Sequence, residues 1–350
     1  MKNKYAAKKN KVTFVDLFSG IGGFHLGLTK AAKKKHASVE CVLAVDIDSK
    51  AQLTYSLNFK NTKILGDIKD PNVRNNIPKY IDIICGGFPC QPFSVAGKKK
   101  GMEDHRGTLF TYIVQILHDK KPKAVFLENV MNLMNIMNGD ERKLIDFIKE
   151  EMAKVGYPVS IHTYKASEFG LPTNRPRLYI VGFRKDILPS APDEDWWPKI
   201  KFKNPVTLAE YFSNLGSKWD KREISREGWP SRVGRTIRLG GVGSAFKSMN
   251  WLKKQNPPPS YYIKINENKI WVNDKRTWDS YLFYEDDIKK MVPHTLTVDE
   301  AKAMMGFQSN FEFPENLSSN QKMKQIGNSV AIPVIEAISL EIINTINKSK

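Results

Sequence analysis

Short apolar runs alternate with amphipathic stretches through the first half of the chain. Residues 22–35 and 51–59, each of which follows such a run, repeat their apolar positions at helical spacing. Strands that alternate with helices predict an α/β fold, in which a largely parallel sheet is covered by helices on both faces. Five runs have the length and apolar character of buried strands, at residues 12–20, 41–48, 80–88, 123–130 and 177–184.

The alternation breaks near Ile187. Four prolines follow within 20 residues, and a glycine-rich stretch (LGGVGS) and the run NPPPS come later. Such punctuation predicts an irregular second domain with little helical periodicity. Helical spacing returns at residues 295–307 and again in the last 25 residues, where the apolar terminal helix is expected to pack back onto the first domain.

These boundaries divide the chain into two expected units. The larger is an α/β domain at residues 1–190, completed by residues 316–350. The smaller is an irregular, mostly β domain at residues 191–315. Since ligands in α/β sheets bind beyond the carboxyl ends of the strands, the chemistry is expected at that edge of the larger domain.

The composition is that of a globular protein. Apolar residues make up 41% of the 350 positions and aromatic residues 11%, which excludes a disordered chain. No apolar run approaches the roughly 20 residues that a bilayer span needs. The basic start is followed by no apolar stretch that would serve as a signal peptide. We therefore expect a cytoplasmic protein without a membrane partner.

The three cysteines are too few for a disulfide framework, and their spacing matches no zinc pattern, so no metal is expected. Cys41 and Cys85 lie inside strand-like runs, where a buried, inert thiol is expected. Cys90 lies instead in GGFPCQPFS, a loop that follows a strand and is stiffened by prolines. A reactive cysteine needs an electropositive site, which the lysines of the next residues can supply. A loop cysteine without function is the alternative.

A net charge of +18 indicates a polyanionic partner. A lysine-rich surface that is merely solvated is the alternative, and the distribution of charge decides between the two. The segment from Trp196 to Trp278 has 17 Lys or Arg against 6 Asp or Glu, and it contains all seven tryptophans. Basic residues interleaved with aromatic ones suit contacts with phosphates and bases, which favours nucleic acid.

The segment DLFSGIGG (16–23) places a glycine-rich turn between the first strand and a helix. Such a turn lets the backbone approach a ligand closely at a helix N-terminus. A dinucleotide fingerprint would need glycine at position 25, where His25 stands, so the turn is a poor NAD site. Asp46 ends the second strand, where a carboxylate can accept hydrogen bonds from ribose hydroxyls. Asp67 follows a further short strand and can bind the adenine end, so a nucleoside ligand is expected.

Two further motifs hold charged groups at strand ends. Glu128, in ENV, ends the fourth strand and is a candidate acid, base or hydrogen-bond donor; a surface or capping carboxylate is the alternative. Arg175 and Arg177, in RPR, precede the fifth strand and can present two guanidinium groups to an anion or a carbonyl.

With QIGNSV at 325–330, these motifs stand in the order found in cytosine-C5 DNA methyltransferases. The chain resembles a bacterial modification enzyme of that family over about residues 12–184 and 292–340. The resemblance implies an S-adenosylmethionine-dependent methyltransferase sheet, with a target-recognition domain and hinge in residues 191–315. Two positions depart from the family pattern, with Thr173 in place of Gln and His294 in place of Arg; we expect them to alter packing rather than reaction type.

The resemblance also implies roles for individual residues. Cys90 would add to carbon 6 of cytosine, and Glu128 would hydrogen-bond or protonate the ring at N3. Arg177 would hold the base, with Arg175 in support. The S-adenosylmethionine site would comprise Phe18, Gly20, Gly22, Gly23, Asp46, Ile47, Asp67, Ile68, Asn328 and Ser329. Candidate DNA contacts are Ser94, Lys98, Lys99, Lys100, Arg106, Thr236, Arg238, Gly240, Gly241 and Gly243.

The expected function is methyl transfer to carbon 5 of a flipped-out cytosine in a specific double-stranded DNA sequence. The expected enzyme is a monomer, for which a cognate restriction endonuclease acting separately is a candidate partner. One alternative applies the same chemistry to RNA cytosine. A remote alternative is an NAD-type oxidoreductase with a reactive cysteine, against which His25 argues.

Overall fold

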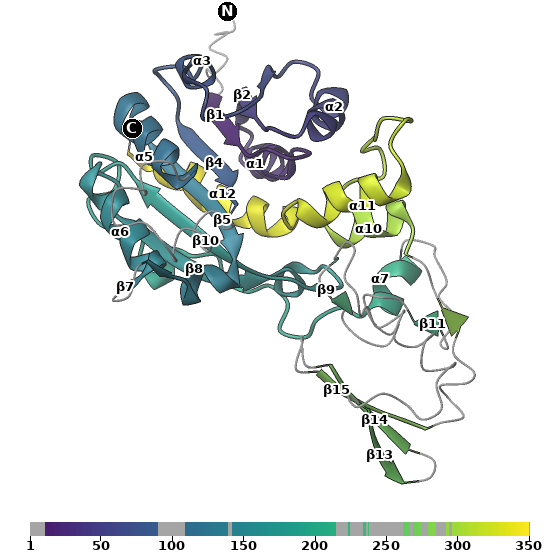
Figure 1. The fold of residues 1–350 in the computed structure, drawn as a ribbon. Helices are drawn as coiled ribbons and strands as arrows, with labels where there is room; N and C mark the ends of the chain where they lie inside the picture. The colour runs from purple at the N-terminus through teal and green to yellow at the C-terminus, as the bar shows by residue number, and fades with distance from the viewer. Residues whose placement is uncertain are drawn as a thin grey trace, which may run out of the picture.

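A seven-stranded sheet forms the centre of the N-terminal unit (Figure 1). Across the sheet the strands are β3 (Ile64–Leu65), β2 (Ser38–Val45), β1 (Lys11–Leu17), β4 (Ile83–Gly87), β5 (Ala124–Val130), β10 (Pro176–Phe183) and β8 (Val159–Lys165). The computed structural model describes residues 11–89, 109–138, 142–214, 223–224, 234–235, 237, 262–266, 269–274, 279–284, 292–293 and 296–349.

The first five strands of that order are parallel, but β10 is antiparallel to both of its neighbours, β5 and β8. The sheet is therefore largely parallel, as expected, except for the antiparallel strand β10, whose direction the sequence analysis did not specify. Only ten residues connect β8 to β10, occupied by the short helix η4 (Ala166–Phe169) and β9 (Thr173–Asn174). A parallel crossover needs a dozen or more residues, so the chain returns in the opposite direction. Strand β8 was not anticipated from the sequence.

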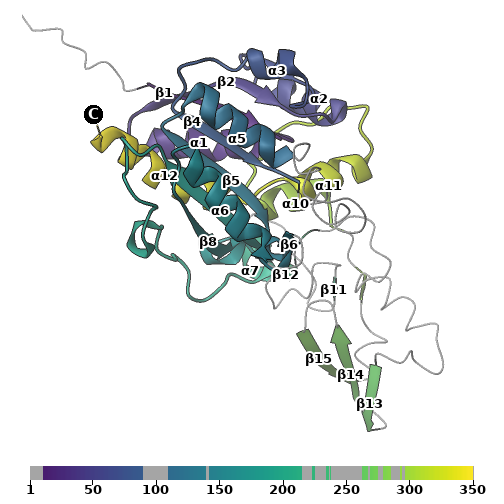
Figure 2. The same cartoon turned by 60° about the vertical axis from the view of Figure 1, so that its left-hand side comes forward.

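Helices cover both faces of the sheet, as expected (Figures 1 and 2). On one face, α1 (Gly23–Lys34), α2 (Ser49–Asn58) and α12 (Ile332–Lys348) contribute to a hydrophobic cluster with alternate residues of β1. On the other, α3 (Pro71–Asn75), α5 (Leu109–Lys120) and α6 (Leu144–Lys154) pack on the intervening residues. Burial on both sides explains the continuous apolar runs of the sequence.

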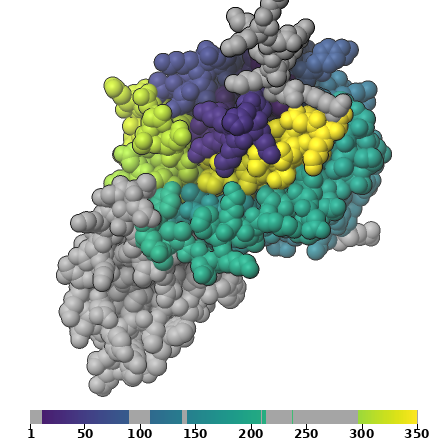
Figure 3. Space-filling model, turned by 180° about the vertical axis from the view of Figure 1, so that it is seen from behind, coloured from purple at the N-terminus to yellow at the C-terminus, as the bar shows by residue number. Residues whose placement is uncertain are grey.

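The terminal helix α12 packs against α1, as expected, and in the view from behind its yellow surface lies between the purple N-terminal part and the teal middle part (Figure 3). Together with α11 (Ser319–Asn328) it has the length and composition of a membrane span. However, 67% of the apolar window is buried inside the protein, and Ser329–Ala331 interrupt the helix. The apolar residues of α12 thus face the protein core, as in the core helix of a soluble protein.

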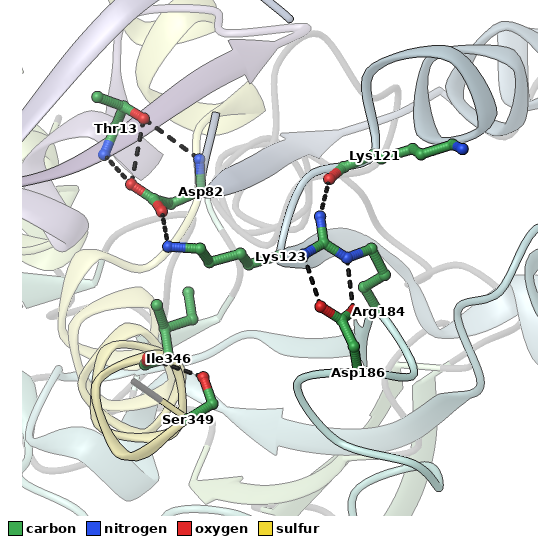
Figure 4. Close-up of polar contacts among 8 residues, drawn as sticks. All are labelled: Thr13, Asp82, Lys121, Lys123, Arg184, Asp186, Ile346 and Ser349. Atoms are coloured by element: carbon green, nitrogen blue, oxygen red, sulfur yellow. Dashed lines mark hydrogen bonds and ion pairs between the residues drawn. The ribbon is translucent and has the colours of Figure 1, made fainter. Parts of the chain in front are cut away.

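Polar contacts tie strands together at the edge where β1, β4 and β5 begin (Figure 4). The Asp82 carboxylate accepts hydrogen bonds from the backbone and side chain of Thr13 and pairs with Lys123 at 2.7 Å. Arg184, just after β10, binds Asp186 and donates to the carbonyl of Lys121. The end of β10 therefore lies at the edge where the parallel strands start.

Between residues 215 and 293 the described elements are short strands, and the irregular, mostly β domain expected there stays a prediction. Strands β13 (Tyr262–Asn266), β14 (Lys269–Asp274) and β15 (Asp279–Tyr284) form an antiparallel sheet, at the bottom of Figures 1 and 2. The remaining short elements are β6 (Met137–Asn138), β7 (Arg142–Lys143), β11 (Glu223–Ile224), β12 (Gly234–Arg235), β16 (Val292–Pro293), η3 (Met131–Asn135), η5 (Glu194–Trp196), α7 (Leu208–Asn214) and α10 (Val298–Met304).

Residues just beyond 190 pack on the first unit. Trp197 is only 2% exposed and belongs to the cluster on the α12 face of the sheet. The indole of Trp196 donates to the Thr345 hydroxyl of α12 at 3.0 Å. The boundary at residue 190 stays a prediction, and these contacts favour a position some residues later.

The contact between α1 and α12 leaves no space for a larger side chain at Gly27. A Cβ atom there would lie 2.5 Å from Cγ2 of Ile335 and 3.1 Å from a backbone nitrogen of α12. We expect Gly27→Val to lower the free energy of unfolding by more than about 2 kcal/mol, because the helices must separate. Lys33→Val, at an exposed position of the same helix, is expected to cost only about 0.5 kcal/mol. Urea denaturation measures both, and equal losses would contradict this packing.

Candidate active site

The reversal of β10 brings the residues before it to the carboxyl edge of the parallel strands. In the register of β10 with β5, Arg177 lies opposite Val130 and Tyr179 lies opposite Glu128. The last residues of β5 and the first residues of β10 therefore meet at the edge where β1, β2 and β4 also end. This is the edge at which α/β sheets bind ligands.

Glu128 and Arg177 form an ion pair at this edge, with 2.9 Å between Oε1 and Nε. The Arg177 Nη1 group also donates to the carbonyl of Pro176, which fixes the guanidinium. Glu128 is 8% exposed, and burial raises the pKa of its carboxyl above the ordinary value, although Arg177 and Arg175 oppose the shift. A carboxyl with a raised pKa retains its proton more readily and can donate it.

Arg175 is buried and directed toward the C-terminal part of the chain. Its Nη2 group donates to the carbonyl of Ser329 at 2.6 Å. Its Nε and Nη1 atoms have no acceptor among the residues that the structure describes. Burial, and then the nearby Arg177, lower the pKa of Arg175 to about 9. An unmet guanidinium donor is costly to bury, so these atoms are available to an incoming oxygen.

Strand β4, which precedes Cys90 in the chain, ends beside Glu128; Cys90 itself lies outside the described residues. Gly87, three residues before the cysteine, pairs with Glu128 in the β4–β5 ladder. A Cβ atom on Gly87 would lie 3.2 Å from Oε2 of Glu128. The Asn129 side chain donates to the carbonyl of Phe88 at 2.8 Å and holds the start of this loop. Sequence reasoning assigned no role to Asn129, although this residue is part of the ENV motif.

The glycine-rich turn after β1 adopts conformations that favour glycine. Gly20 and Gly22 have positive φ angles of 53° and 87°, and so does Phe18, at 53°. The backbone N–H of Gly20 donates to the Asp46 carboxylate at 2.7 Å, which joins the turn to the end of β2. Asp16 lies fully buried in β1 just before this turn, and burial raises the pKa of its carboxyl.

Two close contacts hold the turn from outside. A Cβ atom on Gly22 would lie 2.2 Å from the Phe59 ring, and one on Gly23 would lie 2.6 Å from the Ser329 hydroxyl oxygen. Ser329 is 7% exposed, whereas its neighbour Asn328 is exposed. The QIGNSV motif therefore lies against the glycine turn, although some 300 residues separate them in the chain.

The surroundings of the turn fit an adenosine-containing ligand. The Asp46 carboxylate also accepts from the backbone of Asp48, and burial raises the pKa of Asp46. Ile47, beside it, is 74% exposed, which offers an apolar surface to a base. Asp67 accepts from the backbone of Lys69. No described atom lies within 4 Å of a Cβ built on Gly20, so the turn has open space in front of it. Ile68, by contrast, is 3% exposed and packs in the core.

All ten expected DNA contacts lie outside the described residues: Ser94, Lys98, Lys99, Lys100, Arg106, Thr236, Arg238, Gly240, Gly241 and Gly243. Of the two positions that depart from the family pattern, Thr173 is fully buried in β9, and His294 lies outside the described residues.

The two remaining cysteines are buried free thiols, which confirms the prediction for both. Burial raises the pKa of Cys41 and of Cys85 far above the ordinary value, so neither is a reactive thiolate. Over the described parts of the chain, no group of three His, Cys, Asp or Glu gathers to hold a metal ion.

His25 occupies the position where a dinucleotide-binding turn has glycine. Its ring stacks on Phe59 with 3.9 Å between centroids, and its Nδ1 atom lies 2.8 Å from the Tyr55 hydroxyl. Burial lowers the pKa of His25 to about 4, so the ring is neutral at physiological pH. It is a packing residue that joins α1 to α2.

Comparison with known proteins identifies the class. The chain matches the family of C-5 cytosine-specific DNA methylases over residues 12–344 and belongs to that family. It is 35% identical to the type II methyltransferase M1.ScrFI of Lactococcus lactis subsp. cremoris, covering 98% of this chain and 81% of that protein. It is 33% identical to the type II methyltransferase M.SsoII of Shigella sonnei, covering 97% and 82%.

The fold is also found among solved structures. A variant of Spodoptera frugiperda DNMT2 superimposes with a TM-score of 0.62 at 20% identity, covering 95% of this chain and 99% of that one. The chain is thus a DNA (cytosine-5-)-methyltransferase, and its methyl donor is S-adenosylmethionine.

The glycine turn provides a direct test of the cofactor site. We expect Gly22→Ala to weaken S-adenosylmethionine binding by more than about tenfold, or about 1.4 kcal/mol, because its Cβ displaces Phe59. Gly156→Ala is the matched control, since Gly156 has a similar φ of 91° but no atom within 4 Å of its Cβ. That change should cost stability without altering cofactor affinity. Isothermal titration calorimetry measures both, and unchanged binding by the Gly22 variant would contradict this site.

Proposed function

We propose that the protein methylates carbon 5 of a flipped-out cytosine within a specific double-stranded DNA sequence, through a covalent bond between Cys90 and carbon 6. The observation that carries this proposal is the Glu128–Arg177 ion pair, located beside the strand that leads to Cys90. The relatives named as type II methyltransferases support a role in restriction–modification.

The first step activates the cytosine ring. The Cys90 thiolate forms a bond to carbon 6, the electrons of the 5,6 double bond form a double bond between carbons 4 and 5, and those of the bond between carbon 4 and N3 move to N3. Glu128 donates a proton to N3 as the negative charge develops, a role that its raised pKa favours. Covalent attack converts a weakly nucleophilic carbon into an enamine carbon and divides one difficult step into two.

The second step transfers the methyl group and restores the ring. S-Adenosylmethionine would supply a methyl group on a positively charged sulfur; carbon 5 would form the new bond with its enamine electrons, and the methyl–sulfur bond would break with its electrons going to the sulfur. A base would then remove the proton from carbon 5, the 5,6 double bond would re-form, the Cys90 sulfur would leave with its bonding electrons, and N3 would return its proton to Glu128. We assign no residue to this base.

The other residues of the edge hold and orient the reactants. Arg177, fixed by its ion pair with Glu128, holds the cytosine. Arg175 supports Arg177 in this role, with Nε and Nη1 groups that have no acceptor among the described residues. We propose that the methyl donor lies against the glycine turn, with Asp46 at its ribose, Ile47 and Asp67 at its adenine, and Ser329 near its methionine end. The other residues assigned to this site are Phe18, Gly20, Gly22, Gly23, Ile68 and Asn328.

The DNA is proposed to bind between residues 191–315 and the catalytic unit of residues 1–190 and 316–350. Phosphate contacts are assigned to the basic residues after Cys90, and base recognition to the segment around Thr236. The candidates are Ser94, Lys98, Lys99, Lys100, Arg106, Thr236, Arg238, Gly240, Gly241 and Gly243. We further propose a cytoplasmic, nucleoid-associated monomer whose cognate restriction endonuclease acts separately.

Replacing the nucleophile tests the reaction and reveals its target. We expect DNA from cells that express the wild-type protein to show 5-methylcytosine at one sequence context by bisulfite sequencing. Cys90→Ser should abolish this signal while DNA binding is retained, because a hydroxyl is far less nucleophilic than a thiolate. Cys41→Ala is the control and should leave the signal intact. Methylation by the Cys90 variant would contradict the mechanism.

Replacing the proton donor tests the role of Glu128. We expect Glu128→Gln to lower kcat by about 10²- to 10⁴-fold, because the amide cannot give up a proton to N3. The wild-type rate should fall as the pH rises through the raised pKa of Glu128, since the carboxyl then loses its proton. The variant should lack this alkaline decline.

Glu150→Gln, at an exposed ion pair on α6, is the matched control and should retain both the wild-type rate and its pH profile. Single-turnover methylation across a pH series gives the measurement. An unchanged alkaline decline in the Glu128 variant would assign the proton transfer to another group.

A further inference from the structure

Ile237 belongs to residues 191–315, the proposed recognition region, but it packs against residues next to the candidate active site. Ile237 is only 3% exposed. It belongs to a hydrophobic cluster, here called the junction cluster, that also includes Ile21 of the glycine turn and Ile326 of α11. The cofactor turn and the recognition segment therefore share one packed core.

The residues just before Ile237 pair with the strand that leads to the arginines. In β12, Gly234 lies opposite Thr173 and Arg235 lies opposite Asn174 of β9. The backbone N–H of Arg175 donates to the carbonyl of Thr173, so β9 continues directly into the active site. Thr173, one of the two departures from the family pattern, is fully buried at this contact.

Ile237 also contacts the segment that touches the cofactor turn. A Cβ atom on Gly327 would lie 3.3 Å from the Ile237 carbonyl oxygen. Two residues later, Ser329 accepts the Arg175 hydrogen bond and lies against Gly23. Ile237 thus contacts the segment whose Ser329 supports both Arg175 and the glycine turn.

We propose that Ile237 is a positioning residue that couples recognition of the DNA sequence to S-adenosylmethionine binding. Thr236 and Arg238 are the neighbours of Ile237 in the chain. A DNA contact made by either residue is therefore one peptide bond away from a side chain packed in the junction cluster. This inference rests on the proposed function. Since coupling between two ligands is reciprocal, DNA that binds this segment must tighten cofactor binding by the same factor by which cofactor tightens DNA binding.

The coupling is measured as the ratio of two dissociation constants for S-adenosylmethionine. One is measured without DNA and the other with a saturating duplex that contains the sequence found by bisulfite sequencing. For the wild-type protein we expect a ratio of about 5 or more. For Ile237→Ala we expect a ratio near 1. A duplex with the target sequence scrambled should give a ratio near 1 for both proteins.

Two control variants separate coupling from loss of stability. Leu208→Ala removes a fully buried side chain from the same cluster, but on α7, and should retain the wild-type ratio. Ile237→Val preserves most of the packing and should also retain it. Thermal melting shows that each variant is folded at the temperature of the titration.

The outcomes distinguish this inference from the proposed function. A wild-type ratio near 1, full coupling in Ile237→Ala, or equal loss of coupling in Leu208→Ala would overturn the role of Ile237 while methylation is retained. Absence of methylated sites in cells that express the wild-type protein would instead overturn the proposed function.

Discussion

The direction of β10 is the constraint on which the active-site edge depends. Were this strand parallel to β5, its first residues would lie at the opposite edge, near Asp82 and Lys123. Because the strand is reversed, Arg177 reaches Glu128 at 2.9 Å. An ion pair with so little exposure keeps both groups in a fixed geometry, which the proposed roles require, with Glu128 as proton donor and Arg177 as the residue that holds the cytosine. The ten-residue connection from β8 accounts for the reversal.

A second long-range contact completes the same edge. In the turn between α11 and α12, the carbonyl of Ser329 accepts a hydrogen bond from Arg175, and the hydroxyl of Ser329 lies against Gly23. The C-terminal residues are therefore part of the catalytic unit and not an appendage. Through Ile237, the recognition region is packed into this arrangement as well. Three parts of the chain that are distant in sequence thus support one another at a single junction.

The features that could be predicted from the sequence are those that depend on residues close together in the chain. The first four strands of the sheet, the turn at Gly20 and the strand-end position of Asp46 follow from apolar runs and glycine placement, and the structure has them. The sequence did not predict β8, the direction of β10 or the bond from Asn129 to Phe88, because these depend on pairings between distant segments. The role of Cys90 came from the motif around it and stays a prediction.

The most direct test of the account is a covalent trap. With 5-fluorocytosine at the target position, no proton can leave carbon 5 after methyl transfer, so the bond from sulfur to carbon 6 should persist. In the presence of S-adenosylmethionine, we predict a denaturation-resistant protein–DNA complex in which peptide mass spectrometry locates the methylated nucleotide on Cys90. A complex attached to any other residue, or its absence while ordinary cytosine in the same sequence is methylated, would contradict the account.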